Sequence, residues 1–296
     1  MRLKIIPKQW LYSLVIAALT AFAVGTFLDL PINKMLYRPD SSWASFLYAF
    51  GQAPIYWCLL TSGLLLTFKI RTRVFWKNAL YILLGILLSV FAVYHPVRYA
   101  MKLQIMSTYM VAVSALIVLF LPVAALIFLL RNVEQKRLQQ FTVLMLVVSI
   151  GSFAAVSLIK VLFQRPRYIA LLKEPGLFFQ PWWMITEENI IISQKVLTEP
   201  DLFRSFPSGH TCSAATILCF TILPLYCEPL AKSRNLLFIG SIGYILLVAF
   251  SRMVLGYHFL TDVSAGFMIT LLFFIPAYYW TVNGYKKTLA LRVKSK

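Results

Sequence analysis

The sequence predicts an all-α protein, a polytopic bundle of about eight transmembrane helices. Hydrophobic residues make up 60% of the 296 residues and charged residues only 13%, too few to cover the surface of a soluble domain of this length. Apolar stretches close to the ~20 residues needed to cross a bilayer recur along the chain. Lys and Arg gather between alternate stretches, a pattern typical of membrane topology.

Each expected span is dominated by aliphatic and aromatic residues. The spans lie at roughly 10–28, 53–68, 78–95, 109–130, 141–163, 210–227, 236–255 and 259–281. The second and sixth are short and give the weakest signal. No small-residue cleavage site stands out between the first span and Asp29, so we expect this span to remain as part of the membrane domain.

The net charge of +18 follows the predicted loops. If the N-terminus is cytoplasmic, most basic residues fall on the cytoplasmic side, in the two ends of the chain and near 69–77, 131–137 and 232–234. Most acidic residues fall on the other side, as the positive-inside rule requires. We therefore expect a multi-pass cell-membrane protein with cytoplasmic N- and C-termini, surrounded by the lipid bilayer and without a nucleic-acid partner.

Two segments on the outer side are longer than the other loops. Residues 29–52 are rich in proline and aromatic residues and suit the membrane interface. Residues 164–204 form the largest loop, broken by four prolines, and carry the pairs Phe178-Phe179 and Trp182-Trp183. This loop is either an interfacial anchor or a lid or wall beside a lipid site.

The four cysteines all lie in apolar spans. Their spacing matches neither a zinc site nor a loop disulfide framework. We expect Cys58, Cys212, Cys219 and Cys227 to act as small packing residues.

A first polar cluster ends the fifth span, where Lys160 is followed by Arg165, Pro166 and Arg167. A lysine inside a membrane span is costly and is usually functional or paired. The alternative is a lysine whose ammonium group extends to the lipid headgroups.

A second cluster, Ser205 to His210, opens the sixth span. The N-terminus of a helix has free N–H groups and binds anions. Pro207 suits the first helical turn, and Gly209 lets the backbone approach a ligand closely. The alternative is an ordinary helix cap beside a chance histidine.

A third cluster runs from Ser251-Arg252 to His258 and Asp262 at the start of the eighth span. His258 and Asp262 are four residues apart and share one helix face. A carboxylate there can accept a proton from one ring nitrogen and leave the other exposed. The alternative is a structural His–Asp pair.

Although the last four spans alternate in direction, all three clusters are expected on the same side of the membrane. Together they supply cations, two histidines, a carboxylate and a helix N-terminus. Phosphoryl transfer needs such a set, because charge spreads over the phosphoryl oxygens while nucleophile and leaving group lie in line.

The three clusters resemble the motifs of the type 2 phosphatidic acid phosphatase (PAP2) family, which shares its fold with vanadium haloperoxidases. These motifs are Lys-x6-Arg-Pro, Pro-Ser-Gly-His and Ser-Arg-x5-His-x3-Asp. The matching residues are Lys160, Arg167, Pro207, Ser208, Gly209, His210, Ser251, Arg252, His258 and Asp262. Tyr168 stands where the first motif usually has proline, so the local turn is expected to differ. The resemblance covers roughly 140–281.

The resemblance implies a metal-independent lipid phosphatase with no cofactor, acting through a phosphohistidine at the extracytoplasmic face. His258 would be the nucleophile, Asp262 would orient its ring, and His210 would be the general acid and base. The phosphate would be bound by Lys160, Arg167, Ser208, Gly209 and Arg252. No metal ligands are expected.

The family core usually has six spans, so two N-terminal spans are interpreted as additions. We divide the chain into N-terminal spans 1–135, a catalytic membrane domain 136–285 that includes the outer loop, and a basic cytoplasmic tail 286–296. His95 is expected to be a polar residue at headgroup level, near Arg98 and Lys102, which would attract anionic lipids.

Four substrates fit this picture equally well: undecaprenyl diphosphate, phosphatidic acid, phosphatidylglycerophosphate and a lipid A phosphate. A lipid phosphotransferase using the same site stays open, as does a transporter or lipid-binding protein with an inactive site. A haloperoxidase fits poorly with so many spans.

Overall fold

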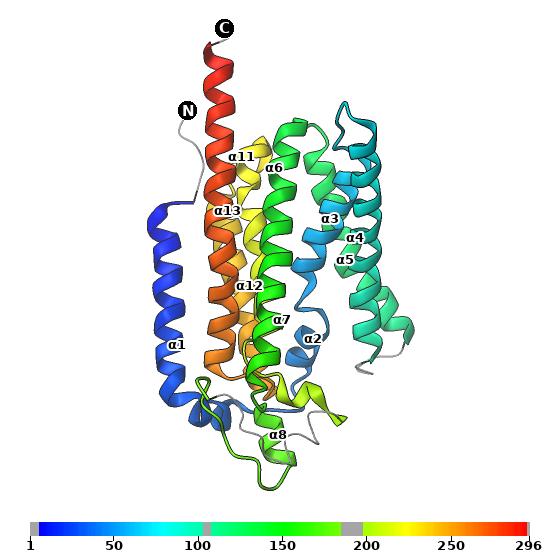
Figure 1. The fold of residues 1–296 in the computed structure, drawn as a ribbon. Coiled ribbons are helices and arrows are strands. Elements are labelled where there is room, and N and C mark those ends of the chain that lie inside the picture. Colours follow the sequence, from blue (N-terminus) through cyan, green and yellow to red (C-terminus); the bar gives the residue numbers. More distant parts are fainter. Residues whose placement is uncertain (1–5, 103–107, 185–197, 295–296) are drawn as a thin grey trace.

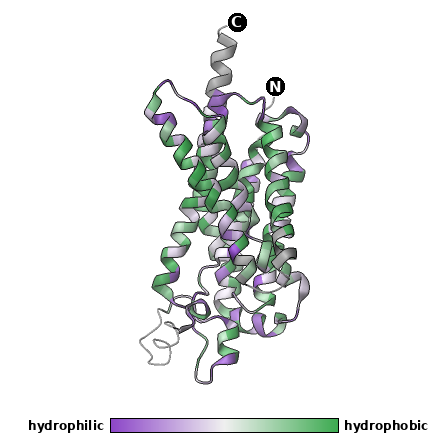
Figure 2. Ribbon diagram, turned by 90° about the vertical axis from the view of Figure 1, so that its right-hand side faces the viewer, coloured by the Kyte–Doolittle hydropathy of each residue, from purple (hydrophilic) through white to green (hydrophobic). Residues whose placement is uncertain are grey.

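The protein is a bundle of helices, and the computed structural model describes residues 6–102, 108–184 and 198–294. Within these ranges no residue lies in a β-strand, and eight helical stretches are long and apolar enough to cross a membrane. They are Lys8–Leu36, Ser42–Phe68, Phe75–Arg98, Val113–Leu130, Gln135–Lys173, Gly209–Tyr226, Arg234–Val254 and Leu260–Lys286. The predicted all-α class and number of spans are confirmed. Figure 2 shows hydrophobic residues along the bundle and hydrophilic residues gathered towards its ends.

Five helices run without interruption: α1 (Lys8–Leu36), α4 (Phe75–Lys102), α5 (Thr108–Leu130), α12 (Arg234–Val254) and α13 (Leu260–Lys294). The other three spans are composite. The second joins α2 (Ser42–Phe50) to α3 (Ala53–Phe68), and the fifth joins α6 (Gln135–Leu146) to α7 (Ser152–Phe163) through a π-helical turn, η1 (Val147–Gly151). The sixth consists of α10 (Gly209–Ala215), the 3₁₀ helix η3 (Thr216–Ile222) and α11 (Leu223–Tyr226).

The spans differ in how much of their surface is covered. The second and sixth are mostly buried, whereas the first and third are mostly exposed and present aliphatic side chains outward, as a lipid-facing helix does. α1 packs along α13, and α3 packs against α4, α5 and α6. The start of α1 and the far end of α13 lie at one end of the bundle, and the short helix α8 (Tyr168–Lys173) lies at the other (Figure 1).

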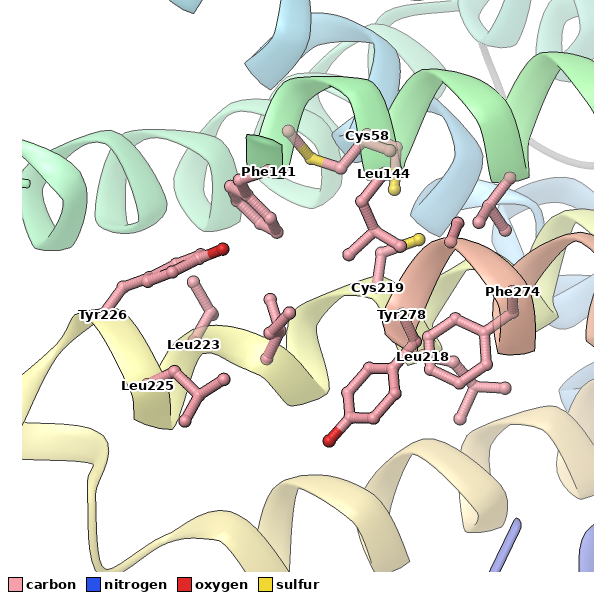
Figure 3. Packing of buried hydrophobic residues seen from close by; sticks show 14 of the residues in the cluster. Cys58, Phe141, Leu144, Leu218, Cys219, Leu223, Leu225, Tyr226, Phe274 and Tyr278 are labelled. Atoms are coloured by element: carbon pink, nitrogen blue, oxygen red, sulfur yellow. The ribbon is translucent and has the colours of Figure 1, made fainter. Parts of the chain in front are cut away.

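The largest apolar cluster fills the centre of the bundle between α6, the sixth span and α13 (Figure 3). Phe141, Leu144 and Phe274 are completely buried there. All four cysteines are buried and unbridged, and Cys58 and Cys219 belong to this cluster. The prediction that the cysteines pack as small apolar residues is confirmed.

Three boundaries differ from the prediction. α1 continues past residue 28 and through Pro31 to Leu36, because the polar residues of this extension, Asp29 and Asn33, are buried and hydrogen-bonded inside the protein. The predicted interfacial segment 29–52 is therefore largely helical. The outer loop contains α8 and the 3₁₀ helix η2 (Pro200–Phe203), while its residues 185–197 lie outside the described part. α13 continues to Lys294, so most of the predicted basic tail is helical.

Candidate active site

Polar side chains from three distant segments line one cavity. The segments lie at the end of the bundle that carries α8 (Figure 1). The segments are the end of α7 with its following loop, the start of α10, and the connection from α12 to α13. They contribute to a cavity of about 480 Å³. Of the predicted site residues, Lys160, Arg167, Gly209, His210 and His258 line this cavity. The others, Ser208, Arg252 and Asp262, are completely buried and lie outside its lining.

Lys160 reaches the cavity from the last turn of α7, where the negative end of the helix dipole favours a cation. Its Nζ donates a hydrogen bond of 2.6 Å to the carbonyl oxygen of Arg204. An ammonium group has three donors. Two therefore remain for a ligand in the cavity.

Two arginines lie close to the same cavity, and aromatic rings hold them in position. The guanidinium of Arg252 lies 4.3 Å from the ring centroid of Tyr48 and 4.6 Å from that of Tyr257. The guanidinium of Arg167 lies 5.0 Å from the Tyr257 ring. Contacts of this kind stabilise a planar cation electrostatically. Together with Lys160, these arginines give the cavity a positive field that favours an anion.

His258 is almost completely buried at the junction of α12 and α13. Its Nδ1 lies 2.6 Å from the carbonyl oxygen of Ser205, and a carbonyl can only accept, so Nδ1 carries the proton. The lone pair of Nε2 is then the nucleophilic one. Burial lowers the pKa of His258 well below its usual value; the charges of Lys160 and Arg252 lower it further, whereas Asp262 opposes them. The ring is therefore neutral at neutral pH.

Asp262 does not bond to His258 as the sequence predicted. Its Oδ2 lies 3.6 Å from Nδ1 of His258, beyond a normal hydrogen bond. This oxygen instead accepts from the hydroxyl of Ser205 at 2.5 Å and from the backbone N–H of Phe259 at 2.7 Å. The second bond reaches back to the residue before the helix, as in a capping box. Asp262 therefore acts on the ring through its charge, while Ser205 supplies the direct bond.

The other oxygen of Asp262 is bound by Arg165, a residue to which the sequence analysis gave no role. The Arg165 guanidinium donates to Oδ1 of Asp262 at 2.6 Å and to Oδ2 of Asp29 at 2.9 Å. All three side chains are buried. Arg165 thus joins α1 to the start of α13. A signal was present in the sequence, because an acidic and a basic residue at the ends of apolar spans indicate a pair.

Asp29 also bonds directly to the start of α13. Its Oδ1 accepts from the backbone N–H of Thr261 at 2.9 Å, and its Oδ2 accepts from the hydroxyl of the same residue. Gly25 makes this approach possible, since a Cβ there would lie 2.8 Å from the backbone nitrogen of Thr261. One turn of α1 therefore supports the start of α13.

The start of α10 differs slightly from the prediction. The helix begins at Gly209, and Ser208 caps it by accepting from the backbone N–H of Thr211 at 3.3 Å. Pro207 therefore precedes the cap and does not lie in the first turn. The backbone N–H of Ser208 donates to the carbonyl oxygen of Asp262 at 2.8 Å. Ser208 thus fixes the geometry of the site, while Gly209 faces the cavity.

The turn after Arg167 is held without the proline that the first motif usually has. Tyr168 begins α8 and is buried, with its ring centroid 5.3 Å from that of Tyr37. The next residue, Ile169, donates its backbone N–H to the carbonyl oxygen of Gly256 at 3.1 Å. Gly256 has a φ of +68°, a conformation that favours glycine. Packing against two other segments thus replaces the rigidity of proline.

His210 contacts the second span, which the sequence analysis did not connect with the site. Its Nε2 lies 2.9 Å from the side-chain nitrogen of Gln52 and 3.2 Å from the carbonyl oxygen of Tyr48. Tyr48, Gln52 and His95 also line the cavity. The prediction for His95 needs correction, because this histidine faces the site and is not simply a headgroup-level residue. No sequence pattern indicated it, since its position depends on how α4 packs.

Comparisons with known proteins agree with this geometry. Residues 141–286 match the family model of the PAP2 superfamily. Over 72 residues the chain is 39% identical to phosphatidylglycerophosphatase B of Bacillus subtilis, a stretch that covers 24% of this chain and 36% of that relative. The chain thus matches only about a third of the relative's length. No solved structure matches the chain. The family match and the three motifs around one cavity lead to the same conclusion: the protein belongs to the PAP2 superfamily, through residues 141–286.

Proposed function

We propose that the protein is an integral membrane lipid phosphatase that hydrolyses a lipid phosphomonoester or diphosphate through a phosphohistidine. The observation that carries this proposal is the convergence of Lys160, Arg167, His210 and His258 on one cavity. The 39% identity to a phosphatidylglycerophosphatase supports the lipid substrate. Under this proposal residues 136–285 form the catalytic domain.

In the first step, the Nε2 lone pair of His258 attacks phosphorus, and the bond from phosphorus to the leaving oxygen breaks. His210 donates a proton to that oxygen, and the lipid alcohol or lipid monophosphate departs. In the second step, His210 takes a proton from water, the water oxygen attacks phosphorus, and the P–N bond breaks. Inorganic phosphate leaves, and both histidines return to their starting states.

The cations supply most of the transition-state stabilisation. Lys160 and Arg167 face the negative charge that spreads over the phosphoryl oxygens, helped by the backbone N–H of Gly209, and the buried Arg252 adds positive charge beside them. Removal of one such donor typically costs about 3–4 kcal/mol in the transition state. The neutral state of His258 matters equally, since a protonated ring has no lone pair to attack with.

We place the site on the extracytoplasmic side. It lies at the end of the bundle opposite the start of α1 (Figure 1), and basic residues concentrate around that start and at the other loops of the same end. The positive-inside rule supports a cytoplasmic location for that end. A cysteine-accessibility assay on intact cells, with Glu174→Cys in the outer loop and Lys136→Cys at the start of α6, at the opposite end of the bundle, tests the orientation. If only Lys136→Cys were labelled, the proposed orientation of the site would be reversed.

The test of function is phosphate release from lipid by the purified protein. The panel contains undecaprenyl diphosphate, phosphatidic acid, phosphatidylglycerophosphate and a lipid A phosphate, each with and without EDTA. We expect hydrolysis of at least one lipid, undiminished by the chelator. A loss in EDTA that a divalent ion restores would contradict the metal-free mechanism. Intact lipids together with transport in vesicles would favour a transporter, and phosphate transfer to an added lipid alcohol would favour a phosphotransferase.

A further inference from the structure

One wall of the active-site cavity is formed by helices outside the segment that matches the PAP2 model. Tyr48 and Gln52 lie at the junction of α2 and α3, and His95 lies in α4. Gln52 is 2.9 Å from Nε2 of His210, the group that protonates the leaving oxygen in the mechanism proposed above. This wall therefore lies on the side where the lipid leaves. The family match covers residues 141–286, so the wall comes from spans that lie outside the matched segment.

His95 is held in a defined orientation in this wall. Its Nδ1 is 2.8 Å from the hydroxyl oxygen of Tyr56, and its ring packs beside Phe91 with centroids 5.3 Å apart. A neutral phenol that donates to Nδ1 leaves the ring proton on Nε2. His95 then has one N–H donor left for a polar group in the cavity.

A second, smaller cavity begins at the same histidine. It has a volume of about 210 Å³ and shares His95 and Phe153 with the active-site cavity. It lies between α3 and α4 on one side and η1 and α7 on the other. Its remaining lining is mostly apolar and consists of Ile55, Tyr56, Leu59, Phe91, Ser149, Ile150 and Ala154. We refer to this second cavity as the chain groove.

The chain groove is open to the surroundings of the bundle at membrane depth. Phe91, Ile150 and Phe153 line it and are 48%, 51% and 39% exposed. The π-helical turn η1 contributes Ser149 and Ile150, and π-turns inside α-helices are frequently found at functional sites. An amphiphile with its phosphate beside His258 can thus extend past His95 into an apolar channel that faces the bilayer.

We propose that helices α3 and α4 select the substrate of the PAP2 site. His95 contacts the polar link next to the scissile phosphate, and the chain groove holds the first part of the leaving lipid's hydrocarbon chain. This inference rests on the lipid phosphatase function proposed above. It adds that selection among lipid phosphates depends on residues outside 141–286.

The test is to fill the groove and measure a ratio. For each variant, kcat/KM is determined for the best long-chain lipid of the panel and for phenyl phosphate, which has no chain. Ala154→Phe should lower the ratio of lipid to phenyl phosphate about tenfold, the loss expected when two methylenes lose their burial. Ile150→Phe is the second groove-filling variant. His95→Leu should also lower the ratio, because it removes the N–H donor at the point where the two cavities meet. The matched control is Ala23→Phe, an exposed position on α1 that lines neither cavity.

The outcomes separate the two proposals. If the wild type hydrolyses lipid and the ratio is unchanged in both groove-filling variants, the chain groove is wrong and the phosphatase proposal stands. Equal losses of kcat/KM on both substrates would also contradict the proposed role of the groove, because they indicate damage to the phosphate pocket. If the wild type releases phosphate from phenyl phosphate but from no lipid, the lipid phosphatase proposal and this inference both fail.

Discussion

The carboxylate of Asp262 lies 3.6 Å from Nδ1 of His258, close enough to act on the ring through its charge but too far for a normal hydrogen bond. The ring nitrogen is bound instead by the carbonyl oxygen of Ser205 at 2.6 Å. Orientation and electrostatic support of the proposed nucleophile are therefore divided between a backbone group and a carboxylate. Loss of the Asp262 carboxylate and loss of the Ser205 carbonyl contact should therefore affect activity differently.

Replacement of His258 tests the nucleophile. His258→Ala should abolish phosphate release, a fall of at least about 10⁴-fold, because it removes the Nε2 lone pair that attacks phosphorus in the proposed mechanism. Phosphate release is measured with the best lipid of the panel, and insertion is checked by the yield and elution profile of the purified protein. Hydrolysis at the wild-type rate would rule out this nucleophile.

Asp262→Asn should be less severe than loss of the nucleophile. A fall in kcat of about 10⁴-fold is known where a carboxylate alone fixes the tautomer of a catalytic histidine. Here the Ser205 carbonyl keeps the proton on Nδ1, so we expect a fall on the order of 10²-fold. Asp262 also accepts a hydrogen bond from Arg165, so the melting temperature of the variant should fall as well. An activity as low as that of His258→Ala would show that Ser205 does not fix the tautomer.

The low pKa of His258 predicts the acidic side of the pH profile. In the proposed mechanism the neutral ring is the nucleophile, and burial lowers its pKa well below the ordinary value of 6.5. After correction for the second ionisation of the phosphate, which lies near pH 6, kcat/KM should stay level as the pH falls through 6.5 and decrease only below it. The proposed mechanism uses His210 as an acid, so activity should also fall on the alkaline side of the profile, and His210→Gln should remove this fall. An acidic limb centred above pH 6.5 would contradict a neutral His258.

The buried pair of Arg165 and Asp29 predicts a large effect on stability. Loss of one partner of such a pair leaves an uncompensated charge and costs about 3–5 kcal/mol. Arg165→Leu and Asp29→Leu should therefore each lower the free energy of unfolding by that order, and the double variant should lose less than the sum of the two. The control is Glu134→Gln, which breaks a pair with Arg137 that is partly exposed and should change the value by at most ~1 kcal/mol. Thermal unfolding in detergent measures all four variants, and additive losses would argue against coupling of Arg165 and Asp29.

The parts of the structure that depend on local sequence could be predicted. Span number follows from apolar stretches of sufficient length, and the positions of Lys160, His210 and His258 follow from motif spacing and the direction of the spans. The extension of α1 past Pro31 could not be predicted, because burial of Asp29 depends on Arg165, far along the chain. Contacts of His95 with the cavity also depend on how α4 packs, which no local pattern encodes.

The relation of Asp262 to His258 shows a second limit. Their spacing of four residues correctly indicated proximity, but a helix-start carboxylate has several donors within reach. The carboxylate of Asp262 accepts hydrogen bonds from the N–H of Phe259, the hydroxyl of Ser205 and the guanidinium of Arg165. Which donor bonds to which oxygen depends on segments that meet only in the folded protein.

The bridge from Asp29 through Arg165 to Asp262 also bears on biosynthesis. The ribosome makes Asp29 before Asp262, so this support can form only after α13 has been synthesised and has entered the bilayer. Catalytic competence would then coincide with completion of the bundle, and a partly inserted chain would not release phosphate at random in the membrane. Deletion of the first span would be expected to yield a disabled protein rather than a minimal phosphatase.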